Sequence, residues 1–398
     1  MNPSFDRIII LADESANWKL AGLRQLDRLV LVLNEFAESA APELKIDIIV
    51  LWRPDIPGEQ RWRPKHPKLT HCRFVERFNS SPGDERVLNT RLLAKRRGLE
   101  QFIRNSVPLD LEQRFVNEST LWQELWRTFE GDCRRAPPQS RSWRYVSERG
   151  EIHRFEQWFL LDSGKSRDGF VSRYLNRPIS RAVSRILLKT PMTPNVWTLL
   201  IILFPVAGFL CLIRGDYFGF VLGAALYQVH SILDGCDGEI ARAKYLDSEK
   251  GPGLDAFGDL IALLLFSLGL GVGLFRAADA PSFSRWIFLG EGILCFLLIA
   301  SRLGPHALEL LRRGPAAVAS SEHDESLRHS GGRVFGTRLT SLAFELTKRD
   351  VVFLTFLLLA ALGLTKWILQ LLFVYAIATA VLLRHGRVAR ADGRTTFV

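Results

Sequence analysis

Asp234, Asp237, Asp255 and Asp259 form two spaced pairs between two long apolar runs of the sequence, where carboxylates are costly. Asp234 and Asp237 are three residues apart, so they would share one face of a helix. Asp255 and Asp259 are four residues apart and would do the same on the next helix. A glycine-containing break at Lys250–Gly253 separates the two pairs and would let the chain turn back. The sequence therefore predicts that the two carboxylate pairs face each other.

Four converging carboxylates repel one another unless cations neutralise them. The candidate ligands are all hard oxygen atoms, without a Cys or His pattern beside them, and such ligands favour Mg²⁺ or Mn²⁺. Two such ions held close together suit chemistry on a phosphate group. An acidic loop between core helices is the alternative interpretation, and it is weaker because acids within membrane segments are usually functional.

The aspartates belong to a longer pattern of eight residues at fixed spacing, Asp234-x2-Asp237-Gly238-x2-Ala241-Arg242-x8-Gly251-x3-Asp255-x3-Asp259. At every position this pattern resembles the signature of the CDP-alcohol phosphotransferase family. The resemblance implies a membrane enzyme that transfers a substituted phosphate group from a CDP-alcohol to an alcohol and releases CMP. It also implies that the four aspartates bind two Mg²⁺ or Mn²⁺ ions, and that Asp259 is the general base.

The same resemblance implies a binding site for the CDP-alcohol. Gly238 would allow close approach of the nucleotide, and Arg242 would pair with its phosphates in the forked geometry that lysine lacks. The family also uses an Asn-x-x-Thr element in its first span and a small residue before the motif glycine. The implied contacts are Asn195, Thr198, Gly238, Ala241, Arg242, Ser248 and Gly251. Asn195 and Thr198 also suit a helix-start cap, which does not exclude a nucleotide contact.

The acceptor alcohol is less well defined than the donor. Relatives that accept a phosphorylated inositol use basic residues near the inner ends of later spans, and Arg302, Arg349 and Arg384 stand at such positions. The positive-inside rule explains these arginines equally well. We expect CDP-diacylglycerol or a related CDP-lipid as donor and inositol phosphate as the first candidate acceptor. Glycerol phosphate, serine and other polyols stay open, and the resemblance also implies a homodimer.

The amino-terminal part of the chain has the pattern of an α/β domain. Apolar runs at residues 7–11 and 46–52 predict buried strands, and residues 26–36 have the apolar spacing of a helix between them. Strand, helix and strand in this order form a βαβ unit with parallel pairing. Residues 71–78 predict another strand, and residues 89–105 predict a basic helix.

Residues 1–160 resemble, more weakly, the nucleotidyltransferase-like domains that precede the phosphotransferase in bifunctional inositol-phosphate cytidylyltransferase/phosphotransferases. An active domain of that kind has a glycine-rich loop after its first strand, because glycine lets backbone N–H groups approach a triphosphate. Ala12-Asp13-Glu14-Ser15 stands in that place here. We therefore expect a degenerate, non-catalytic domain, with retained synthesis of a CDP-alcohol from CTP as the alternative.

Residues 165–190 combine apolar residues at helical spacing with arginines on another face. The arginines recur every four residues, at Arg173, Arg177, Arg181 and Arg185. This pattern predicts an amphipathic helix that lies in the membrane surface. A soluble helix that packs on the first domain is the alternative.

Residues 191–398 are predicted to form an all-α membrane domain with six spans. The apolar runs are residues 196–213, 217–233, 254–274, 286–299, 351–364 and 367–383. A hydrocarbon core of about 30 Å needs about 20 residues, so the shorter runs would use flanking residues. Arginines and lysines gather on the sides that an even number of spans places inside. Both termini and the aspartates are therefore predicted to face the cytoplasm of an inner or plasma membrane.

The formal net charge of +10 suits an anionic partner. The arginines concentrate beside apolar segments, so the charge fits an anionic lipid surface better than nucleic acid. A transferase of phospholipid biosynthesis is the main hypothesis. A bifunctional enzyme is the second, and a non-catalytic membrane scaffold is a third that the intact aspartate set argues against.

Overall fold

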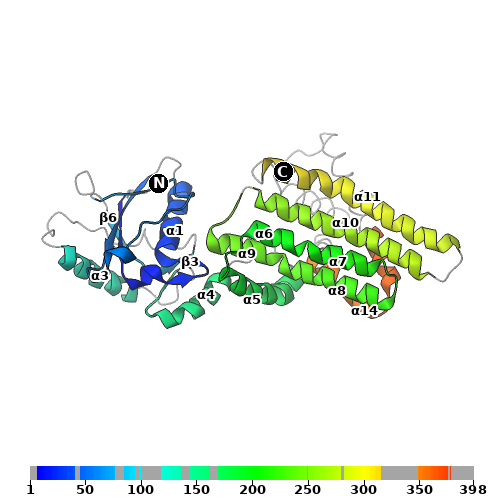
Figure 1. Cartoon of the computed structure of the whole chain (residues 1–398), viewed down its shortest axis with the longest axis horizontal. Coiled ribbons are helices and arrows are strands. Elements are labelled where there is room, and N and C mark those ends of the chain that lie inside the picture. The colour runs from blue at the N-terminus through cyan, green and yellow to red at the C-terminus, as the bar shows by residue number, and fades with distance from the viewer. Residues whose placement is uncertain are drawn as a thin grey trace, which may run out of the picture. The chain divides into compact units, whose positions relative to one another are not determined.

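The computed structural model describes the chain in segments. They are residues 7–40, 45–76, 85–95, 99, 118–135, 143–161, 169–248, 250–278, 282–314, 348–374 and 377. The chain divides into two compact units, Met1–Asp162 and Ser163–Val398. Figure 1 draws both units, and each is described by itself below.

The amino-terminal unit is built on a four-stranded parallel sheet with the order β5-β4-β1-β6. Its strands are β1 (Arg7–Ala12), β4 (Ile46–Trp52), β5 (Cys72–Phe74) and β6 (Glu85–Asn89). Ile8 to Ala12 are all buried, because β1 lies between two neighbours and is covered on both faces. The predicted α/β character and the parallel pairing are thus confirmed.

Helices accompany this sheet, and two short antiparallel pairs form separate two-stranded sheets. The helices are α1 (Gln25–Ala40), α3 (Glu118–Arg135) and α4 (Ile152–Leu161), with 3₁₀ turns at Glu14–Asn17, Gly58–Gln60 and Arg149–Glu151. Strand β2 (Lys19–Leu20) pairs with β3 (Leu23–Arg24), and β7 (Leu92–Ala94) pairs with β8 (Trp143–Tyr145). The helix predicted for residues 89–105 is wrong at its start, because Asn89 ends β6 and residues 92–94 are β7, whereas Leu99 is helical.

The second unit is mostly helical. A π-helical stretch at Ser172–Asn176 leads into the first α-helix. The helices are α5 (Arg177–Leu188), α6 (Pro194–Ile201), α7 (Leu203–Leu212), α8 (Tyr217–Leu233), α9 (Gly235–Lys244), α10 (Gly251–Ala277), α11 (Ser282–Arg313), α14 (Arg349–Ala361) and a further helix at Thr365–Val374. Figure 1 shows α10 and α11 side by side.

Three helical segments among the described residues are long and apolar enough to cross a membrane. They are Pro194–Leu212, Gly251–Ala277 and Arg285–Arg312. The other three predicted spans correspond to α8, to α14 and to the apolar helix Thr365–Val374, which are shorter in the part that the structure describes. Six spans therefore stay a prediction. Arg384 lies outside the described residues.

Close packing fixes α10 against α11. A Cβ added to Gly271 of α10 would lie 2.9 Å from the Cα of Gly292 in α11. A Cβ added to Gly253, near the start of α10, would lie 2.7 Å from the Cα of Leu311. The two helices are therefore antiparallel, with their backbones in contact near both ends, as small residues permit between membrane helices.

An aromatic cluster holds α8, α10 and α14 together. Phe266 of α10 stacks on Phe356 of α14 with ring centroids 5.1 Å apart, and its ring meets Tyr227 of α8 edge-on at 4.8 Å. All three side chains are buried. Aromatic pairs in these arrangements are favourable beyond their buried area, so they fix the helices that carry the predicted site.

Candidate metal and nucleotide site

Three of the four predicted aspartates converge. Asp234 lies at the junction of α8 and α9, and Asp255 and Asp259 lie one turn apart in the first part of α10. One carboxylate oxygen from each residue lies within 4.8 Å of the others. Such a group can hold a divalent cation by hard oxygen ligands alone.

The chain between the aspartates explains why they meet. Asp234 has helical backbone angles, so α8 continues into α9 almost without a break. Helix α9 then ends at Tyr245, whose left-handed backbone (φ 56°) turns the chain, and Tyr245 is buried. Helix α10 begins at Gly251 with Pro252 in its first turn, a position where proline is well tolerated. The reversal points α10 back past the end of α8.

Asp237 lies outside this three-carboxylate group and has a different partner. Its Oδ2 lies 2.8 Å from the hydroxyl of Thr198 in α6, which donates to it. The same hydroxyl lies 3.1 Å from the carbonyl oxygen of Pro194. The contact joins a residue of the predicted metal set to one of the predicted nucleotide set, and it orients the Asp237 carboxylate.

Two glycines of the motif make room for polar side chains. A Cβ added to Gly251 would lie 3.2 Å from Ser248 Oγ and 4.0 Å from Asn195 Oδ1. A Cβ added to Gly238 would lie 3.1 Å from Nη1 of Arg242. The structure thus brings Asn195, Ser248 and Gly251 together, and it lays the Arg242 guanidinium over Gly238.

The Arg242 guanidinium is incompletely paired. Within the described residues, its Nε and Nη2 have no hydrogen-bond partner although both atoms are buried. Burial, together with the positive charge of Arg177, lowers the pKa of Arg242 from its ordinary value. An arginine still stays protonated in proteins, so Arg242 offers a charged donor suited to a phosphate. Ala241, the remaining member of the predicted nucleotide set, is half-buried beside it on α9.

Arg349, predicted as an acceptor contact, reaches the aspartates directly. From the first residue of α14 its guanidinium forms ion pairs with both Asp234 and Asp259. One positive charge of this chain thus pairs with two of the three convergent carboxylates and offsets part of their repulsion. Arg302, the second predicted acceptor residue, is half-buried on α11.

The sequence interpretation missed a buried ion pair behind the motif helix. Glu239 of α9 is fully buried, and its Oε1 accepts from Nη1 of Arg177 at 3.1 Å and from Oγ of Ser180 at 3.0 Å. Arg177 was expected on the polar face of a surface helix, yet it faces inward. The four-residue arginine spacing was visible in the sequence, but nothing there identified Glu239 as the partner.

A second contact holds the start of the same helical segment. The backbone N–H of Ser172 donates to Oδ2 of Asp350 at 2.5 Å, and Asp350 is buried directly after Arg349 in α14. Meanwhile apolar side chains of the segment point outward, with Phe170 and Ile186 exposed at 71% and 68%. The segment is therefore fixed through polar contacts and exposes apolar side chains.

We expect Arg177→Met to destabilise the protein by about 3 kcal/mol, because it leaves Glu239 buried without its cation. Thermal unfolding in detergent measures the effect, with Arg173→Met, at an exposed position of the same segment, as the matched control. Adding Glu239→Gln to Arg177→Met should recover much of the loss. Equal unfolding temperatures for wild type and Arg177→Met would contradict a stabilising role for the pair.

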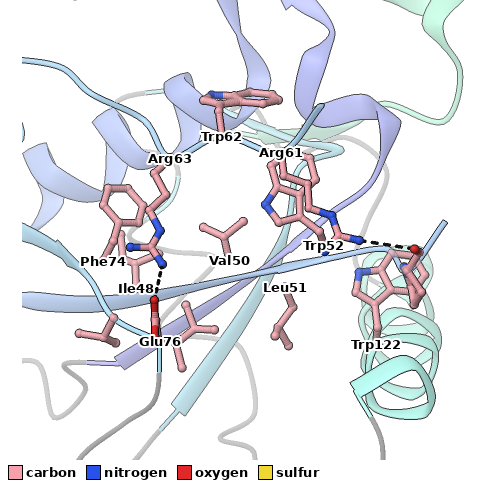
Figure 2. A pocket seen from close by; sticks show the side chains of 13 residues that line it. Ile48, Val50, Leu51, Trp52, Arg61, Trp62, Arg63, Phe74, Glu76 and Trp122 are labelled. Atoms are coloured by element: carbon pink, nitrogen blue, oxygen red, sulfur yellow. Dashed lines mark hydrogen bonds and ion pairs between the residues drawn. The ribbon is translucent and has the colours of Figure 1, made fainter. Parts of the chain in front are cut away.

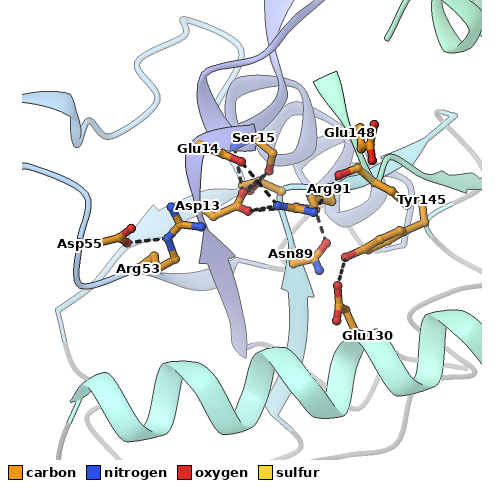
Figure 3. Close-up of polar contacts among 12 residues, drawn as sticks. Asp13, Glu14, Ser15, Arg53, Asp55, Asn89, Arg91, Glu130, Tyr145 and Glu148 are labelled. Atoms are coloured by element: carbon orange, nitrogen blue, oxygen red, sulfur yellow. Dashed lines mark hydrogen bonds and ion pairs between the residues drawn. The ribbon is translucent and has the colours of Figure 1, made fainter. Parts of the chain in front are cut away.

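The amino-terminal unit has its own polar cluster at the end of β1 (Figure 3). Asp13 is fully buried, accepts from the backbone N–H of Ser15 at 2.9 Å, and pairs with Arg91 at 2.8 Å. The Arg91 guanidinium also lies over the rings of Trp18 and Trp126. Ligands of open α/β sheets bind where the strand order reverses, here between β1 and β6. A carboxylate paired with an arginine stands at that position.

Comparison with known proteins finds a family match in one part of the chain. Residues 191–314 match the family model described as CDP-alcohol phosphatidyltransferase. The matched range contains all four aspartates and the predicted nucleotide contacts, and it ends before Arg349.

Curated relatives share part of this sequence. The chain is 39% identical over 125 residues to the "Bifunctional IPC transferase and DIPP synthase" of Archaeoglobus fulgidus, covering 31% of this chain and 24% of that protein. It is 36% identical over 168 residues to the protein of the same name from Rubrobacter xylanophilus, covering 41% of this chain and 38% of the relative. The similarity thus spans less than two fifths of either relative's length.

Proposed function

We propose that the protein transfers a substituted phosphate group from a CDP-alcohol to a hydroxyl of a polar acceptor, because residues 191–314 match the CDP-alcohol phosphatidyltransferase family model. CMP is the second product, and phospholipid biosynthesis is the setting. The observation that carries the proposal is the convergence of Asp234, Asp255 and Asp259. The underpaired Arg242 and the Asn195, Ser248 and Gly251 cluster support it from the nucleotide side.

The aspartates fit a divalent metal, and we propose Mg²⁺ or Mn²⁺ in two sites. Asp234, Asp237, Asp255 and Asp259 would hold the ions, because their donor set consists of hard carboxylate oxygens. When bound, the ions supply positive charge to the pyrophosphate of the donor. Thr198 keeps the Asp237 carboxylate in a fixed orientation through its hydroxyl.

Asp259 is the proposed general base. A carboxylate oxygen of Asp259 takes the proton from the acceptor hydroxyl, and the hydroxyl oxygen attacks the phosphorus on the lipid side of the donor. A new P–O bond forms, the P–O bond to CMP breaks, and its electron pair leaves with CMP. Arg349 forms an ion pair with this carboxylate and holds it beside the other convergent aspartates.

The nucleotide part of the donor is assigned to a second group of residues. Arg242 would pair with its phosphates, and the absence of a side chain at Gly238 lets the backbone approach them. Asn195, Thr198, Ala241, Ser248 and Gly251 complete the proposed CDP contacts. CDP-diacylglycerol or a related CDP-lipid is the proposed donor, since three described helices of this unit are long and apolar enough to cross a membrane.

The acceptor is proposed to be an anionic alcohol bound by basic side chains. Arg302, Arg349 and Arg384 are the candidates, and Arg349 already stands beside the aspartates. Inositol phosphate is the first candidate because of the resemblance in residues 1–190. Glycerol phosphate, serine and other polyols remain alternatives that a substrate panel distinguishes.

We further propose a homodimeric multi-pass protein whose amino-terminal unit and aspartates face the cytoplasm. Six spans with both ends inside follow from the charge pattern. The outward apolar side chains at Phe170 and Ile186 support placement of residues 165–190 in the membrane surface.

A bifunctional enzyme is the second candidate, favoured by the printed names of the relatives. In that case residues 1–160 would make a CDP-alcohol from CTP. The Asp13–Arg91 pair argues against it, because a buried carboxylate at the end of β1 opposes a triphosphate. Release of pyrophosphate from CTP by the full-length protein would favour the bifunctional candidate.

The test of the main proposal is CMP release by the purified protein from CDP-diacylglycerol in detergent. We expect release only with an acceptor and with Mg²⁺ or Mn²⁺, and recovery after EDTA when the metal is restored. The acceptor panel comprises inositol phosphate, glycerol phosphate, inositol and serine. No CMP from any acceptor, with metal present, would favour the non-catalytic scaffold.

A further inference from the structure

A cavity of about 760 Å³ lies beside β4 in the amino-terminal unit (Figure 2). Its volume is within the range of small-molecule pockets. The lining comes from β4, from the loop after it and from α3, and its polar and aromatic members include Trp52, Arg61, Trp62, Arg63, Glu76 and Trp122. Trp52 ends β4, so the cavity reaches the carboxyl end of a parallel strand, where α/β sheets bind ligands.

Two indole rings form an aromatic wall whose orientation is fixed. The ring centroids of Trp52 and Trp62 are 5.1 Å apart. Nε1 of Trp62 donates to Asp27 at 3.1 Å, and the guanidinium of Arg24 lies 4.7 Å from its ring centroid. These contacts hold Trp62 in place without a ligand. Such preorganised aromatic surfaces are favourable for stacking of a planar base.

The cavity also presents donors without matching acceptors. Nε of Arg61 donates to the carbonyl of Ile56 at 2.9 Å and Nη2 to that of Pro54 at 3.4 Å, so the guanidinium is oriented by the backbone. Among the described residues, no carboxylate forms an ion pair with it. Trp122 is only 6% exposed, and its Nε1 has no hydrogen-bond partner in the described part of the chain.

An unpaired buried donor is costly, and an acceptor on a ligand would remove that cost. An oriented, uncompensated guanidinium is the usual partner of a phosphate. The remaining charges of the wall, Arg63 and Glu76, pair with each other at 3.3 Å and are both largely exposed, so they leave the charge of Arg61 in place. The wall therefore combines aromatic faces, one positive charge and one free donor.

We propose that this cavity binds a nucleoside monophosphate. The base stacks on Trp52, whose ring packs against the tilted ring of Trp62, the phosphate pairs with Arg61, and Nε1 of Trp122 donates to an acceptor of the ligand. The cavity lining includes neither Asp13 nor Arg91, although Trp52 pairs with Ala12 next to Asp13, and the proposed site carries out no chemistry. It does not depend on the transferase activity proposed above.

Titration of the full-length protein in detergent tests the proposal, with tryptophan fluorescence and calorimetry as readouts. The buffer contains EDTA, which removes the metal that the aspartates need, so a failed transferase assay does not affect the result. The probes are CMP, AMP, ribose 5-phosphate and inorganic phosphate. We expect saturable binding of at least one nucleotide and at least tenfold weaker binding of ribose 5-phosphate and phosphate.

Two variants and a control locate the site. Arg61→Gln should weaken nucleotide binding at least tenfold, and Trp122→Phe, which keeps an aromatic ring but removes the N–H, should weaken it several-fold. Lys65→Gln changes an exposed charge of the same loop outside the cavity lining and should bind as wild type does. No saturable nucleotide binding, or equal affinities for wild type and Arg61→Gln, would overturn the proposal. Equal affinities for inorganic phosphate and for the nucleotides would contradict stacking of the base in the cavity.

Discussion

Asp259→Asn is expected to lower the rate of CMP release at least a hundredfold, since general bases contribute about 10²- to 10⁴-fold. The amide has nearly the same shape as the carboxylate but cannot take the proton of the acceptor hydroxyl. The measurement is the initial rate of CMP formation from CDP-diacylglycerol at saturating Mn²⁺ and acceptor. At saturating metal, weaker metal binding by the variant contributes little to the difference in rate between Asp259→Asn and wild type.

Asp216→Asn is the matched control for this change. Asp216 caps the opposite end of α8, where its carboxylate accepts from the N–H of Gly219 at 2.7 Å. Asparagine caps helices as well as aspartate does, so the control should keep both fold and rate. A rate for Asp259→Asn within threefold of wild type would exclude Asp259 as the base.

Arg349→Met is expected to raise the KM for an anionic acceptor at least tenfold and to lower the Mn²⁺ concentration that gives half-maximal rate. The first effect follows because a charge-assisted hydrogen bond to phosphate is worth about 1.5–3 kcal/mol. The second follows because the guanidinium and a metal ion compete for oxygens of Asp234 and Asp259. Acceptor titrations at fixed Mn²⁺, and Mn²⁺ titrations at fixed acceptor, separate the two effects.

Two comparisons sharpen this prediction. The KM for uncharged inositol should change little, because inositol has no phosphate that could pair with Arg349. Arg312→Met is the control for the loss of one positive charge. Arg312 is exposed on α11, at the end of that helix that lies against the start of α10. An unchanged KM for inositol phosphate together with a higher Mn²⁺ requirement would show that Arg349 serves only to support the aspartates.

The convergence of the aspartates could be predicted from the sequence because it depends on local rules. Spacings of three and four residues place side chains on one helix face, and Gly251 with Pro252 predicts a new helix after a turn. The orientation of the Asp237 carboxylate depends on Thr198, about forty residues earlier in the chain. Asp237 accepts a hydrogen bond from the hydroxyl of Thr198. Local spacing could not show that Asp237 has this partner while the other three aspartates converge.

Long-range pairs account for most of what the sequence did not show. Arg177 fits the polar face of a surface helix by its spacing, but burial against Glu239 decides its direction. Likewise, no local pattern in the sequence indicates that the Asp350 carboxylate accepts a hydrogen bond from the backbone N–H of Ser172. In the amino-terminal unit, the basic composition after Asn89 favoured a helix. Pairing of β7 with β8, about fifty residues further on, gives strand structure instead.

The backbone contacts between α10 and α11 also limit how the site can move. Gly271 lies against Gly292, and Gly253 lies against Leu311, so sliding α10 along α11 would drive backbone into backbone at two distant points. Asp255 and Asp259 are therefore carried by a nearly rigid pair of helices. Rearrangement of the site is then left to the turn between α9 and α10 and to side chains such as Arg349, since side chains move on faster timescales than whole helices.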